Sequence, residues 1–148
     1  MIRVAVSNRQ HTLKLDVPRL KRRARCVLRD MGLTDTELSV VFVDDEEMRR
    51  LNAAYRSLDR PTDVLAFAMT EGAFGDINPQ LLGDVVISTQ TACVQAERAG
   101  RSGDDELDAL LVHGILHLIG YDHERSAADA RTMRNQERRL RRLLQTTA

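Results

Sequence analysis

Three of the four histidines of this 148-residue chain lie within eleven residues, and this cluster restricts the possible folds more than any other feature. His113 and His117 are four residues apart in an apolar stretch, so on a helix they share one face with Cβ atoms about 5–6 Å apart. That separation lets two imidazoles reach one ion at about 2.0–2.1 Å. Gly120 can adopt the left-handed conformation that ends a helix. The chain can then fold back and bring His123 in as a third ligand.

Three histidine ligands favour a catalytic metal site. They leave a fourth coordination position open, whereas a structural zinc site is closed by four protein ligands. We expect one zinc ion, although three imidazoles also accept Ni²⁺, Co²⁺ or Cu²⁺. A lone histidine on an apolar helix is more often a hydrogen-bonded core residue. The third histidine, placed after a glycine that ends the helix, makes that simpler interpretation the weaker one here.

Gly114 decides which chemistry the site favours. The spacing matches the metzincin pattern H-E-x-x-H-x-x-G-x-x-H at all positions but one, because Gly114 stands where those proteases have a general-base glutamate. Peptide hydrolysis is therefore disfavoured unless another carboxylate enters the site. A glycine within a helix costs roughly 1 kcal/mol relative to alanine. We hypothesise that Gly114 leaves space beside the metal for a bulky substrate group such as a phosphodiester.

Asp122 is a weaker candidate for a catalytic role. It adjoins His123 and could orient that ligand or act as a base, but an aspartate that stabilises a turn is an equally good interpretation.

Hydrophobic periodicity predicts nine elements in the order β-α-β-α-β-β-α-α-α. This order indicates an α+β fold, in which a small mixed four-stranded sheet packs with about five helices and the metal site lies at the end of a long central helix. The expected strands are 2–6, 38–43, 64–69 and 85–88, the expected helices are 17–31, 44–55, 89–99, 104–119 and 126–144, and a loop is expected at 71–80.

The second helix shows an expected start and an expected inner face. Asp44 followed by Glu47 predicts a capping box. Met48, Leu51 and Tyr55 follow at helical spacing and are expected to face the core.

Composition and length are typical of one globular domain, spanning residues 1–148. The chain is 43% hydrophobic and 30% charged. No segment approaches the roughly 20 apolar residues of a membrane helix. The N-terminus has no apolar signal core, so a cytoplasmic protein is the default expectation. Two cysteines, Cys26 and Cys93, are too few for a disulfide framework and are expected to be buried free thiols.

Arginine is unevenly distributed along the chain. The net charge is zero, which gives no hint of a nucleic-acid partner, but 20 of the 22 basic residues are arginine. They cluster at 19–29 and 131–142. A solvated helix face is the simpler interpretation of each run, although arginine also suits phosphate binding.

The segment His113-Gly-Ile-Leu-His-Leu-Ile-Gly-Tyr-Asp-His123 resembles the signature of the YbeY endoribonucleases, bacterial factors of ribosomal RNA maturation. Residues 51–65 and 82–87 resemble two further stretches of that family, and Met133 and Glu137 lie where its last helix usually carries them. One departure is clear: the family commonly continues Val-Leu-Ser-Phe-Pro, whereas this chain has Ala66 and Ala68. That change puts in doubt a contact of this strand with substrate.

The resemblance implies a zinc-dependent, single-strand-specific endoribonuclease in small-subunit (16S) ribosomal RNA maturation and ribosome quality control, with RNA and the ribosome as partners and no membrane. It also implies that Arg56 works near the metal, and a guanidinium can hold a phosphate through two parallel charge-assisted bonds. The general base is unassigned, and the RNA 2′-hydroxyl could itself be the nucleophile. Two alternatives stay open: a ribosome-assembly or RNA-binding factor whose metal only stabilises the fold, and a metalloprotease.

Overall fold

The computed structural model describes residues 1–69 and 81–147, so the loop expected at 71–80 lies outside the described residues. The order of the elements is the one that periodicity predicts. The strands are β1 (Ile2–Arg9), β2 (Thr36–Val43), β3 (Val64–Ala68) and β4 (Leu81–Ser88), and the helices are α1 (Val17–Asp30), α2 (Asp45–Arg56), α3 (Thr89–Ala99), α4 (Gly103–Ile119) and α5 (Ala127–Gln145).

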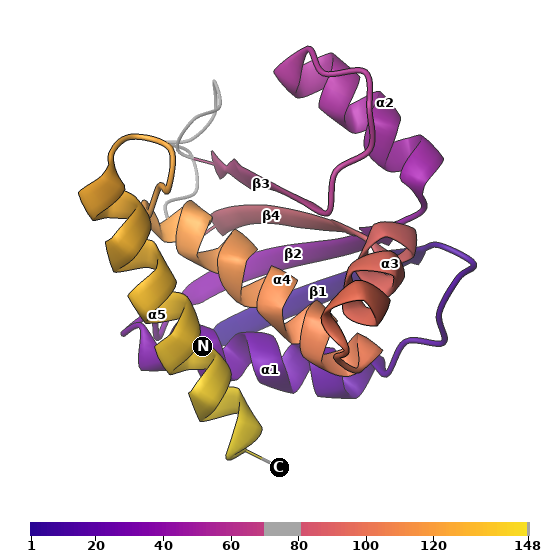
Figure 1. The fold of residues 1–148 in the computed structure, drawn as a ribbon. Coiled ribbons are helices and arrows are strands. Elements are labelled where there is room, and N and C mark those ends of the chain that lie inside the picture. Colours follow the sequence, from indigo (N-terminus) through magenta and orange to yellow (C-terminus); the bar gives the residue numbers. More distant parts are fainter. Residues whose placement is uncertain (70–80, 148) are drawn as a thin grey trace.

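The strands form one mixed sheet in the order β1-β2-β4-β3. The pairs β1–β2 and β2–β4 are parallel, and β3 runs antiparallel to β4. Helices α1 and α4 cover one face of the sheet, α3 and α5 flank α4, and α2 packs on the opposite face (Figure 1). The expected α+β fold with a four-stranded mixed sheet and five helices is confirmed.

Strand alternation divides the core between the two faces of the sheet. Val85 and Ile87 of β4 belong to the larger core cluster under α1 and α4, whereas Val86 belongs to the smaller cluster under α2. Helix α4 lies in the middle of the helical layer, which explains why apolar residues occupy most of its circumference. The three histidines of the predicted site lie in the C-terminal half of this helix and in the segment that follows it.

Two expectations about α2 are wrong. Asp44 does not form a capping box, because its carboxylate instead accepts hydrogen bonds from the backbone N–H of His11 (3.4 Å) and the hydroxyl of Thr12 (3.2 Å). Glu47 pairs with Arg9 at 3.1 Å. Tertiary contacts with the β1–α1 connection have thus replaced the local cap. Tyr55 is also not a core residue, since 68% of it is exposed.

The remaining global expectations concern thiols and membranes. Cys26 and Cys93 are free, as expected, but both are only partly buried. Among the described residues, no helix combines the length and the apolar character that crossing a bilayer requires.

Candidate metal centre

Helix α4 is held at both ends by local hydrogen bonds. At its start, the Ser102 hydroxyl accepts from the backbone N–H of Asp105 at 3.1 Å. At its end, Gly120 has a φ of 116°, and the N–H of Tyr121 donates back to the carbonyl of Leu116 at 3.0 Å. This left-handed ending reverses the chain, as the sequence predicted, and a short turn then leads into α5.

The reversal brings the three histidines together. One nitrogen of His113, one of His117 and one of His123 lie within 4.8 Å of one another, so the group could hold a metal ion. The ring centroids are 5.2–5.4 Å apart. The first two rings are partly buried and the third is exposed. One side of the cluster therefore stays open to solvent.

Burial keeps the central histidine in the form that binds metals. The pKa of His117 is lowered, first by desolvation and then by repulsion from His113 and His123, while Asp122 and Glu124 oppose the shift. The imidazole is therefore neutral at neutral pH, with a lone pair available for an ion.

Glu137 reaches the cluster from α5. Its Oε2 lies 3.6 Å from Nδ1 of His113, and both side chains are largely shielded from solvent. A carboxylate beside one ring nitrogen orients an imidazole and leaves the other nitrogen, here Nε2, for an ion. The sequence pointed to Glu137 only through the family resemblance, because no local spacing relates α5 to α4.

Asp122 stabilises the turn that carries His123. Its Oδ1 accepts from the backbone N–H of Glu124 at 2.8 Å, and this bond is the main reason that the pKa of Asp122 is lowered. Its other oxygen lies 3.6 Å from Nε of Arg125. Of the interpretations open from the sequence, the turn-forming one accounts for these contacts.

Arg56 lies at the C-terminal end of α2, and its side chain reaches the turn that carries His123. Its Nη2 is 3.7 Å from Oε1 of Glu124, and that oxygen is 3.8 Å from Nε2 of His123. Glu124 thus lies between the guanidinium and the histidine cluster. Sequence analysis did not single it out, and its position next to His123 was the only signal.

Gly114 faces the sheet rather than the histidines. A Cβ at this position would lie 2.6 and 3.0 Å from the two Cγ atoms of Val85 and 3.4 Å from Cγ2 of Val64. The hypothesis that Gly114 leaves space for substrate beside the metal is therefore wrong. Its missing side chain lets α4 approach β4 closely, and any larger side chain here would meet Val85 and Val64.

The two alanines that depart from the family pattern also face α4. Ala66 and Ala68 pack against the larger core cluster, whereas Leu65 and Phe67 face α2. The small side chains of Ala66 and Ala68 fit between α4 and the edge strand β3.

The fold and the site together define a mixed α+β protein whose central helix and following turn gather three histidines into a candidate metal centre. The family model described as Endoribonuclease YbeY matches residues 5–145, and the chain belongs to the YbeY endoribonuclease family. The resemblance found in the motifs is thus confirmed.

Individual relatives match most of the chain. It is 49% identical over 140 residues to the Endoribonuclease YbeY of Geobacter metallireducens, covering 94% of this chain and 93% of the relative. It is 44% identical to that of Aquifex aeolicus, covering 91% and 87%. The solution structure of TM1509 from Thermotoga maritima superposes with a TM-score of 0.65 at 25% identity, covering 97% of this chain and 89% of that one.

Proposed function

We propose that this protein is a zinc-dependent endoribonuclease that cleaves single-stranded RNA during small-subunit ribosomal RNA maturation, in the cytoplasm and in association with the ribosome. The observation that carries the proposal is the cluster of three histidines within 4.8 Å, beside Arg56, in a member of the YbeY endoribonuclease family.

His113, His117 and His123 would hold the metal ion. The donor set fits a transition metal, because imidazole nitrogens suit Zn²⁺ and Ni²⁺ and the lowered pKa of His117 keeps that ligand neutral. When bound, such an ion supplies Lewis-acid stabilisation of the charge on a phosphodiester. Glu137 holds the ring of His113 for this task.

Arg56 would bind the phosphate that is cleaved. Its side chain is half exposed and meets Glu124 at 3.7 Å, longer than a direct hydrogen bond. Such an exposed pair contributes little stability, so an RNA phosphate can replace the carboxylate. A guanidinium then neutralises the charge that develops on the phosphoryl oxygens.

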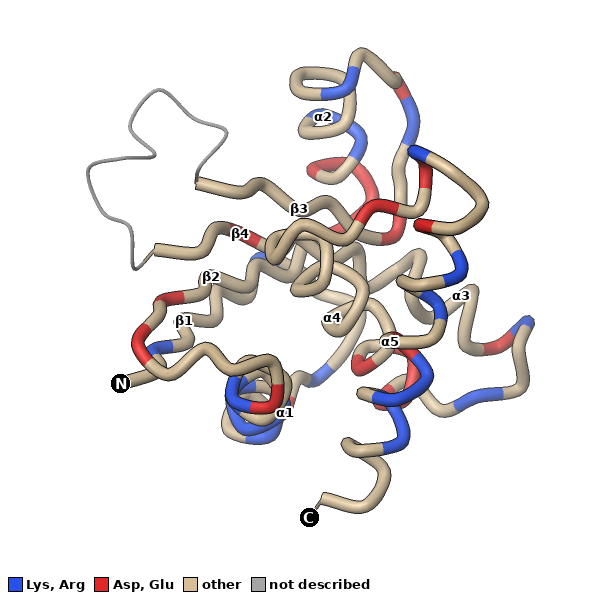
Figure 2. The backbone as a smooth tube through the Cα atoms, turned by 90° about the vertical axis from the view of Figure 1, so that its left-hand side faces the viewer, with Lys and Arg blue, Asp and Glu red and all other residues tan. Residues whose placement is uncertain are grey.

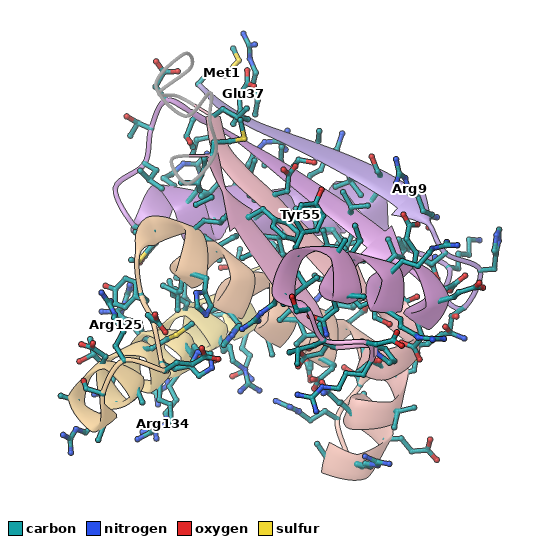
Figure 3. The ribbon with its side chains drawn as sticks, turned by 90° about the horizontal axis from the view of Figure 1, so that it is seen from above. Met1, Arg9, Glu37, Tyr55, Arg125 and Arg134 are labelled. Carbon is teal, nitrogen blue, oxygen red and sulfur yellow. The ribbon has the colours of Figure 1, made fainter. Side chains whose placement is uncertain are left out.

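An arginine stripe on α5 supports binding of the RNA backbone. Arg131, Arg134 and Arg138 are exposed, lie at spacings of three and four residues, and make no ion pair within the described part of the chain. The helix starts just after the turn that carries His123, and its basic residues follow its length (Figure 2). Figure 3 shows Arg134 pointing away from the ribbon into solvent.

The product ends would identify the nucleophile. A 2′,3′-cyclic phosphate indicates attack by the 2′-hydroxyl of the RNA, whereas a 5′-phosphate indicates attack by water.

The test combines metal analysis with RNA cleavage for the wild type and three variants. We expect the wild type to retain about one zinc ion per chain and to cleave single-stranded RNA. His117→Ala should lose both metal and cleavage, and Arg56→Ala should keep the metal and lose cleavage. Arg50→Ala is the matched control, because Arg50 is an exposed arginine of the same helix that faces Glu46.

Two outcomes would contradict the proposal. A folded, metal-loaded wild type without nuclease activity would favour an assembly factor with a structural metal. The same conclusion follows if His117→Ala unfolds the chain while Arg56→Ala leaves function intact.

A further inference from the structure

Tyr55 is a large aromatic side chain that the fold leaves in solvent. It lies in the last turn of α2 and is 68% exposed, more than any other large hydrophobic residue of the described part of the chain except Met1. Its hydroxyl makes no hydrogen bond within the described residues. Exposing an aromatic ring to water is unfavourable. Neither burial nor a hydrogen bond within the described residues offsets that cost at Tyr55.

The ring has a rigid support on one side only. Its centroid is 5.0 Å from that of Phe67 on the edge strand β3, with an angle of 59° between the ring planes. Phe67 packs in turn on the core cluster of Val43, Met48, Leu65 and Val86. This tilted arrangement is one that aromatic pairs prefer. Tyr55 is thus held against Phe67 on one side, while its other face is exposed.

Tyr55 also lies beside the residues that would contact RNA. It precedes Arg56, whose guanidinium reaches Glu124 next to His123. In Figure 3, Tyr55 projects from α2 over the strands of the sheet. A strand of RNA with one phosphate at Arg56 would therefore pass its neighbouring bases close to the Tyr55 ring.

We propose that Tyr55, supported by Phe67, is a stacking subsite for one unpaired base of the RNA substrate. This inference rests on the proposed nuclease function and explains a preference for single strands. A base within a duplex is already stacked on both faces, whereas an unpaired base can turn out onto an aromatic ring. Because every base has an aromatic face, the subsite tolerates different sequences.

The composition of the chain makes the subsite directly observable. It contains no tryptophan and only two tyrosines, Tyr55 and Tyr121, so tyrosine fluorescence reports on few positions. The probe is a short unstructured oligoribonucleotide, added to the His117→Ala protein so that cleavage does not consume it. We expect the RNA to quench a fluorescence component that Tyr55→Phe lacks.

The affinity for the RNA probe distinguishes a contribution of the Tyr55 ring from one of its hydroxyl. Tyr55→Phe should bind the probe as tightly as its parent, since the aromatic face remains. Tyr55→Ala should bind it about 5- to 150-fold more weakly, the range that corresponds to about 1–3 kcal/mol for one stacked base. Val94→Ala is the control, because Val94 is an exposed apolar residue of α3. It should bind like its parent.

An RNA backbone without bases completes the test. On this abasic probe Tyr55→Ala and Tyr55→Phe should bind equally, because no base is present to stack, and a general loss of structure would weaken both probes alike. Equal affinity of the two variants for the ordinary RNA would overturn the subsite, as would weakening that persists on the abasic probe. If the wild type does not cleave RNA but the Tyr55-dependent quenching is seen, the proposed function fails and the subsite stands.

Discussion

Replacing Gly114 by alanine adds one methyl group where α4 crosses β4. The new Cβ would lie 2.6 Å from Cγ1 and 3.0 Å from Cγ2 of Val85, whereas carbon atoms in contact normally lie about 3.5–4.0 Å apart. Val85 is fully buried and β-branched, so it has little freedom to rotate away. The helix must therefore lift from the sheet by several tenths of an ångström.

The expected effect on stability follows from two opposing contributions. Overpacking a well-packed core costs about 1–3 kcal/mol, and an approach this short to a rigid side chain belongs at the upper end. Alanine in place of glycine within a helix returns about 1 kcal/mol. We expect Gly114→Ala to lower the free energy of unfolding by about 2 kcal/mol, measured by urea denaturation of the metal-free protein.

A double-mutant cycle tests the cause. Val85→Ala removes both clashing methyl groups and alone should cost about 2 kcal/mol through the space it leaves. If the alanine methyl at 114 fills part of that space, the double variant should be at least about 1 kcal/mol more stable than the sum of the single effects. Additive effects, or a Gly114→Ala protein more stable than the wild type, would refute the packing argument. The folded fraction should cleave RNA normally.

Two further predictions concern the site. Glu137→Gln should weaken metal binding about 10- to 100-fold, because the charge that orients His113 is removed; unchanged affinity in a metal competition titration would remove Glu137 from the site. Replacing all three arginines of the α5 stripe by glutamine should flatten the dependence of RNA affinity on salt, by about 0.7 in the logarithmic slope for each phosphate that the protein no longer neutralises. Arg3→Gln is the control, because Arg3 is an arginine of the edge strand β1 that pairs with Glu37. This edge lies opposite β3, the strand next to α2. An equal flattening in both proteins would show that the stripe has no special role in binding the backbone.

The sequence was sufficient for the features that depend on short-range geometry. A helix repeat and a helix-ending glycine place His113, His117 and His123 on one side of a reversal, and the structure contains that arrangement. The order of strands and helices was also predictable, because the period of the apolar residues changes from one element to the next.

Features that depend on distant contacts were not predictable in the same way. The role of Gly114 depends on which strand lies under α4, and a local pattern cannot say so. The sequence around Asp44 is typical of a helix cap, yet its carboxylate accepts a hydrogen bond from Thr12, which lies in a distant part of the chain. Arg56 and Glu137 reach the histidine segment only because the fold brings α2 and α5 to the end of α4.

The residues of the site come from opposite faces of the sheet. The histidines belong to one short segment on the α4 face, whereas Arg56 and Tyr55 arrive on α2, which packs over the other face beside the edge strand β3. Fewer buried residues anchor α2 than anchor α4, so we expect local unfolding to release α2 while α4 stays folded. We therefore expect a preparation with full metal content to include molecules that do not bind RNA. Metal content would report the histidine segment alone, whereas RNA binding would also report the position of α2.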